Sequence, residues 1–238
     1  MKLQATGFMV ALAILTMVHS TEAQANPCSF PNGDQTTTAE LIANIVVNNA
    51  SCALPWRALK REVSDGRKRR SIERALEEVA KRDPKRSKAV RSQKATVAAA
   101  AGYPQEMLAI ADANVLASPE DKSLPNMSCF VRGRYGFDVD HAMPFCNAAV
   151  AAGRPLWALV NRGRVELALG LFKEALADFD EALAKEGSSG HSMVVDARFG
   201  RGVARLKLGD SGGNEDLTAA LKARPTVAAD FADADIRP

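Results

Sequence analysis

The stretch LWALVNRGRVELALGLFKEALADFDEALAKEG, residues 156–187, decides the fold that we expect for this chain. Small and bulky apolar residues recur along it at steps of three, four and seven, the spacing of one face of an α-helix. Gly170 interrupts the pattern and predicts a turn between two helices. The small residues allow these antiparallel helices to approach closely, and the bulky ones fill the gap to a neighbouring pair. The small set is Gly163, Gly170, Ala175 and Ala182, and the bulky set is Leu159, Leu167, Phe172, Phe179 and Leu183.

Two further units flank this one, as a search for internal repeats shows. Residues 194–226 form a degraded copy whose glycine-rich turn is one residue short. Residues 126–153 run as helix, turn at Gly136 and helix, with Asp138 or Asp140 as the candidate N-cap of the second helix. Three helical hairpins are therefore expected in the C-terminal half.

The hairpin pattern resembles the tetratricopeptide repeat family. This resemblance implies a right-handed α-solenoid of antiparallel hairpins over residues 126–228, and the fold class that we expect is all-α. Gly187 stands where the family usually has a proline. The residues that carry the resemblance are Asn161, Arg162, Gly163, Leu169, Gly170, Phe172, Ala175, Phe179, Ala182 and Leu183.

The N-terminal half, residues 26–118, lacks the small and bulky pattern, although aromatic residues are only 5% of the chain and alternating β-branched runs are scarce. We expect helical hairpins there, with their repeat character open. Two prolines mark residues 119–125 as a hinge or linker, and residues 229–238 form an acidic tail. Candidate turn glycines, spaced 34 to 39 residues apart, are Gly66, Gly102, Gly136, Gly170 and Gly209.

The first 25 residues have the order of a signal peptide: Lys2, an apolar run of 11 residues, and a polar stretch that ends at Ala25. The run is too short to span a bilayer, which takes about 20 residues. We expect cleavage near Ala25, export to the periplasm or the medium, and no transmembrane segment in the mature chain.

Four cysteines favour disulfides in an exported chain. Three connectivities are possible, and we prefer the two local pairs, because each would clamp a helix to its neighbour. The pairs are Cys28 with Cys52 and Cys129 with Cys146. The second pair also fits a cysteine-bearing repeat that resembles those of exported family members.

Positive charge is concentrated in residues 57–94, which hold 15 Lys/Arg against 6 Asp/Glu. Export and the lack of interleaved aromatic residues argue against nucleic acid. An anionic lipid or polymer of the envelope, an acidic protein, or simple solvation remain as interpretations. The candidate basic patch is Lys60, Arg61, Arg67, Lys68, Arg69 and Arg70.

No nucleophile elbow, HExxH helix, phosphate-binding loop or dinucleotide fingerprint occurs in the sequence. We therefore expect no enzyme activity, cofactor or metal. Solvated surface positions are expected for His141 and His191 and for the acidic clusters around Asp178 and Asp230, and core positions for both tryptophans, Trp56 and Trp157.

The family's first helices line a concave groove that binds peptides or proteins. The resemblance thus implies a partner-binding groove here, and its arginines favour an acidic segment or a free C-terminal carboxylate. Our leading hypothesis is an adaptor of the periplasm or cell envelope; the alternative is a binder of anionic envelope surfaces through residues 57–94. The candidate groove residues are Asn161, Arg164, Arg198, Arg201 and Arg205.

Overall fold

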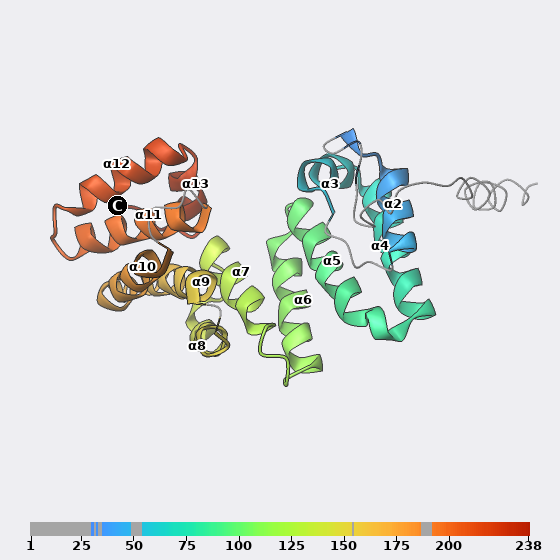
Figure 1. Cartoon of the computed structure of the whole chain (residues 1–238), viewed down its shortest axis with the longest axis horizontal. Coiled ribbons are helices and arrows are strands. Elements are labelled where there is room, and N and C mark those ends of the chain that lie inside the picture. Colours follow the sequence, from blue (N-terminus) through green and yellow to red (C-terminus); the bar gives the residue numbers. More distant parts are fainter. Residues whose placement is uncertain (1–29, 31, 33–34, 49–53, 154, 187–191) are drawn as a thin grey trace, which may run out of the picture.

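The computed structural model describes residues 30, 32, 35–48, 54–153, 155–186 and 192–238. These residues form twelve α-helices, two short 3-10 helices and no strand, which confirms the all-α prediction. Figure 1 shows the helices of the N-terminal half beside those of the C-terminal half. No helix in the described part of the chain is both long and apolar enough to cross a membrane.

The N-terminal half packs around one apolar cluster that includes Leu41, Leu59, Ile72, Leu76 and Val97, each fully buried. Its first helix begins after Thr37, which forms a reciprocal capping box with Glu40. That helix ends at Val47. The elements are α2 (Thr38–Val47), α3 (Trp56–Val63), α4 (Gly66–Arg82), η2 (Pro84–Arg86), α5 (Ser87–Ala100) and α6 (Pro104–Ala117).

The C-terminal half contains three helical hairpins, α7 with α8, α9 with α10 and α11 with α12, at the positions of the three predicted units. Neighbouring hairpins are in contact, since α9 packs on both α7 and α11. The elements are α7 (Pro125–Tyr135), η3 (Val139–His141), α8 (Met143–Ala151), α9 (Pro155–Ala168), α10 (Phe172–Glu186), α11 (Ser192–Lys207), α12 (Gly213–Ala223) and α13 (Val227–Ala232).

Four of the five predicted turn glycines follow a helix with φ between 69° and 84°: Gly102, Gly136, Gly170 and Gly209. This left-handed conformation favours glycine, which has no Cβ. Gly66 was predicted wrongly, because it is the first residue of α4 and follows the helix cap Asp65.

Close packing of the hairpins centres on Phe179 of α10, which is fully buried. Its ring lies between Gly163 of α9 and Gly200 of α11. A Cβ added at Gly163 would come within 2.8 Å of Cζ of this ring, and one added at Gly200 within 2.3 Å. The small residues therefore allow the close approach that the sequence pattern predicts.

A disulfide joins Cys129 of α7 to Cys146 of α8, with the sulfur atoms 2.11 Å apart, as predicted. The other predicted disulfide, Cys28 with Cys52, lies outside the described residues, as does the predicted signal peptide. The predicted aspartate N-cap of the second helix is wrong. Helix α8 begins at Met143 after Ala142, and Asp138 binds Arg132 instead.

The two halves are joined by packing around residues 118–124, which are not helical. Val131 of α7 packs with Ala95 and Met107 of the N-terminal half. The guanidinium of Arg132 donates to both carboxylate oxygens of Asp112 in α6, each at 2.9 Å. The predicted linker therefore lies at a packed junction between α6 and α7.

Candidate partner-binding faces

Arginines of the first helix join the two helices of the second and third hairpins. Arg162 of α9 donates through two nitrogens to Asp178 of α10, at 2.7 Å each. Arg201 of α11 does the same to Asp216 of α12, at 2.8 and 2.6 Å. Such bidentate pairs fix orientation as well as contributing energy. Because Asp178 and Asp216 are buried, the expected solvated position is wrong for Asp178.

An arginine directly before a close-packed glycine marks the first helix of all three hairpins. The dipeptides are Arg132-Gly133, Arg162-Gly163 and Arg201-Gly202. In α7 the arginine binds Asp112 of the preceding helix and Asp138 of the turn between α7 and α8, and no acid of α8. In the other two hairpins, an aspartate 15 or 16 residues after the arginine accepts its hydrogen bonds.

The five candidate groove residues do not form one exposed surface. Asn161 and Arg164 are buried, with 1% and 3% exposure. Arg201 and Arg205 both bind Asp216 within their own hairpin. Arg198 is partly buried and makes no ion pair with any described residue. The five side chains are therefore not all exposed, and partner binding by any of them stays a prediction.

The C-terminal segment, residues 226–236, lies against a set of arginines from different hairpins. Arg134 of α7 donates to the Asp230 carbonyl at 2.7 Å and to its carboxylate at 2.8 Å. It also donates to Asp233 at 2.5 Å. Arg224 forms an ion pair with Asp230 at 3.3 Å. Asp233 is exposed, as expected for a tail acid, although it is paired, whereas Asp230 is only partly exposed.

An aromatic anchor completes this contact. Phe231 is fully buried, with its ring centroid 4.8 Å from that of Phe199 in α11. The guanidinium of Arg164 stacks over the same ring, 3.9 Å from its centroid. We name this surface the arginine face: Arg134, Arg164, Asp196, Phe199 and Arg224.

Arg164 is incompletely paired within the arginine face. Burial lowers its pKa to about 10, and the positive charges of Arg134 and Arg224 act in the same direction against the attraction of Asp196. Its Nη2 donates to the Asp230 carbonyl at 2.6 Å, but its Nε has no hydrogen-bond partner within the described residues. Buried unpaired donors are costly, so this site favours additional acceptors.

A second group with a strongly shifted pKa, the carboxyl group of Glu166, lies in the α9–α10 hairpin. Burial, followed by the negative charge of Asp178, raises the pKa of Glu166 to about 8. The carboxyl group is therefore mostly protonated at neutral pH. Glu166 is almost fully buried, so its effect is on stability rather than on a surface.

The predicted basic patch divides into paired and unpaired residues. Arg61 and Lys68 bind Glu62 at 2.8 and 2.9 Å, and Arg69 binds Glu73 and Glu106 at 2.7 and 2.6 Å. The remaining residues are exposed and form no ion pair with any residue that the structure describes. They are Lys60, Arg67 and Arg70.

Glu62 ties three helices of this region together. It accepts a hydrogen bond from Thr38 of α2 at 2.5 Å, and it binds Lys68 of α4. These contacts, first that of Thr38, lower the pKa of Glu62 to about 2. Half of the predicted basic patch thus has a structural role.

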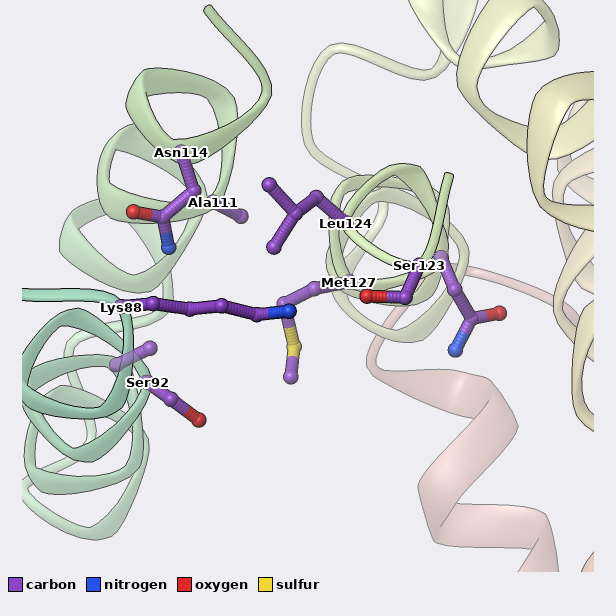
Figure 2. A pocket seen from close by; sticks show the side chains of 9 residues that line it. Lys88, Ser92, Ala111, Asn114, Ser123, Leu124 and Met127 are labelled. Atoms are coloured by element: carbon purple, nitrogen blue, oxygen red, sulfur yellow. The ribbon is translucent and has the colours of Figure 1, made fainter. Parts of the chain in front are cut away.

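A small pocket of about 200 Å³ lies between α5, α6 and the start of α7. Figure 2 shows Lys88 extending across it toward Met127, with Asn114 and Ala111 on the neighbouring helix α6. Lys88 is already paired with Asp121. The Ser123 hydroxyl, which also lines the pocket, donates to the same Asp121 carboxylate at 2.6 Å, so these polar groups pair with one another.

Two further predictions concern single residues. His141 is exposed, as expected. Trp157 is 49% exposed, so its predicted core position is wrong. The Trp56 side chain and His191 lie outside the described part. No group of three or more His, Cys, Asp or Glu among the described residues is arranged to hold a metal ion.

Comparison with known proteins gives no match to a family model, a curated protein or a solved structure.

Proposed function

We propose that this chain is a non-enzymatic adaptor of the tetratricopeptide-repeat type, which binds another exported or envelope protein through the arginine face. The observation that carries this proposal is that the face already holds a short acidic helix, α13, by ion pairs and an aromatic anchor. A surface that holds one helix in this way has the chemistry to hold another.

The hairpins provide a rigid support for such recognition. Arg134, Arg164 and Phe199 come from three different helices, and their relative positions depend on the packing of α7, α9 and α11. The Cys129–Cys146 disulfide fixes the first hairpin, and the Phe179 ring fixes the other two. Preorganised side chains lose less entropy on binding, which favours affinity.

Affinity capture from an envelope extract tests the proposal. Wild type is compared with an Arg134→Glu variant and with a control variant in which Lys60, Arg67 and Arg70 are changed to glutamine. The control loses three positive charges at a different surface. We expect the control to retain a protein partner that the Arg134→Glu variant loses; loss by the control alone would contradict the proposal.

A second candidate function is binding to an anionic envelope surface through residues 57–94. It is favoured by the unpaired, exposed cations Lys60, Arg67 and Arg70. Charge attraction of this kind weakens as salt rises. Co-sedimentation with anionic vesicles at low and at physiological salt tests it: binding that disappears in the triple glutamine variant supports this function, and equal binding by the variant rejects it.

A further inference from the structure

The C-terminal segment that covers the arginine face has the chemistry of a ligand. Within it, Asp230 and Asp233 contribute carboxylates, and Phe231 contributes an apolar anchor. The Asp230 carbonyl lies at the C-terminal end of α13 and accepts from both Arg134 and Arg164, at 2.7 and 2.6 Å. The last carbonyls of a helix have no partner inside the helix, so the two guanidiniums satisfy one of them and favour its partial negative charge.

We infer that α13 is a replaceable occupant of the arginine face, and that the partner is a protein segment presenting the C-terminal turn of an acidic helix with the pattern Asp-Phe-x-Asp. This inference rests on the proposed adaptor function and specifies its ligand. The pattern is that of Asp230-Phe231-Ala232-Asp233 in the chain itself.

Charge requires an acidic occupant. Of the carboxylates that act on Arg164, one belongs to Asp196 of the face and the other to Asp230 of the tail. Removal of the tail would leave Arg134, Arg164 and Arg224 facing the single carboxylate of Asp196. A neutral or basic segment would leave these cations unbalanced, which is unfavourable in a partly desolvated site.

The tail helix also depends on its contacts with the rest of the chain. Helix α13 has six residues, and a helix of that length is not stable without external contacts. Its link to α12, Pro225 and Thr226, is exposed, and Asp233 is about half exposed. Arg164 keeps an unpaired Nε beneath it. A segment that brings an acceptor to this Nε would therefore bind better than the tail does.

Phe231 and Ile236 of the tail belong to the same buried cluster as Phe179 and Phe199, but the closest contacts between the hairpin helices are made without the tail. Phe179 packs between Gly163 and Gly200. In the next hairpin, a Cβ at Gly202 would meet Leu217 at 2.9 Å, which shows an equally close contact inside α11 and α12. Displacement of the tail would therefore leave these helix-to-helix contacts in place, and a replacing segment must supply an apolar side chain where Phe231 is buried.

Hydrogen exchange of the unmodified full chain is the first test. The amides of Ala234 and Ile236, which donate to the Phe231 carbonyl, are expected to exchange at least about 100-fold faster than those of α9 and α11, because local opening costs less than global unfolding. Equal protection in both regions would overturn the inference, since the tail would then open only when the whole chain unfolds.

Binding of a labelled peptide with the sequence of residues 225–238 is the second test. The full chain with Asp230→Asn and Asp233→Asn has a loosened tail. An Asp235→Asn chain is the matched control, because Asp235 is 91% exposed and contacts only Arg237 among the described ion pairs. We expect the loosened chain to bind the peptide at least about tenfold more tightly than the control, because a tethered tail competes at high effective concentration.

The remaining outcomes decide against the inference or separate it from the adaptor proposal. Equal binding by the loosened chain and the control, with both folded, overturns it. Dimerisation of the loosened chain by exchange of tails also overturns it, because the occupant would be a second copy. If the loosened chain unfolds, the hydrogen-exchange result decides. If these tests fail, affinity capture from the envelope extract still tests the adaptor proposal by itself.

Discussion

Replacement of Gly200 by alanine tests the packing of the hairpins most sharply. The added Cβ would lie 2.3 Å from Cζ and 2.5 Å from Cε2 of the Phe179 ring. The ring cannot move away easily, because Gly163 is close to its other side and a Cβ there would be within 2.8 Å. The substitution therefore forces a shift of α10 relative to α11.

The expected magnitude follows from two opposed effects. Alanine is favoured over glycine inside a helix by about 1 kcal/mol. Overpacking of a well-packed core typically costs about 1–3 kcal/mol, occasionally more, and we place this site at the upper end or beyond because real atoms do not approach to 2.3 Å. A net loss of about 2 kcal/mol would lower Tm by roughly 4–8 °C for a chain of this size.

Thermal unfolding followed by circular dichroism is the assay, with Gly66→Ala as the matched control. A Cβ at Gly66 meets only the Arg70 side chain, at 3.5 Å. We expect the control to match the wild type or exceed it slightly. A smaller side chain at the same position, Phe179→Leu, should recover part of the loss in the Gly200→Ala background. If Gly200→Ala unfolds at the temperature of the control, the packing account is refuted.

Three further predictions concern stability. Because the pKa of Glu166 is raised to about 8 in the folded chain, the folded chain binds more protons than the unfolded chain between about pH 4.5 and 8. The free energy of unfolding should therefore fall as pH rises through this range, by at most about 1.4 kcal/mol for each unit of the pKa difference. Glu166→Gln should flatten this slope in denaturant titrations. The pKa of Glu62 is lowered to about 2, so its stabilisation is present above about pH 4.5 and lost as pH falls toward 2; Glu62→Gln should be destabilised at pH 6 but converge with the wild type in acid. Replacement of Cys129 and Cys146 by serine should cost about 3 kcal/mol, as the loop-entropy model gives for a loop of this size, and no change in chemical denaturation would contradict a stabilising disulfide.

Local sequence patterns predicted the hairpins well because they depend on neighbours within a few turns. Steps of three and four residues place Gly163 and Phe179 on contacting faces, and Gly170 supplies the left-handed turn between their helices. The prediction of a turn at Gly66 was wrong because glycine occurs both in turns and at the first position of a helix, here after the N-cap Asp65.

The arginine contacts could not be predicted in the same way. Arg134 and Asp230 are separated by 96 residues, and no local periodicity links them. The resemblance to a groove-lining family placed Arg164 and Arg201 on an open surface, whereas one is buried under the tail and the other binds Asp216. The repeated arginine–glycine dipeptides and their following aspartates were a usable signal for the pairs within hairpins.

Hydrogen exchange of the chain in complex with its captured partner tests the central claim most directly. The account predicts that protection increases around Arg134, Arg164 and Phe199 on α7, α9 and α11. It also predicts that residues 227–236 lose protection, because the partner displaces them. Protection confined to α3 and α4, with the tail still bound, would contradict the claim and place recognition on the basic segment.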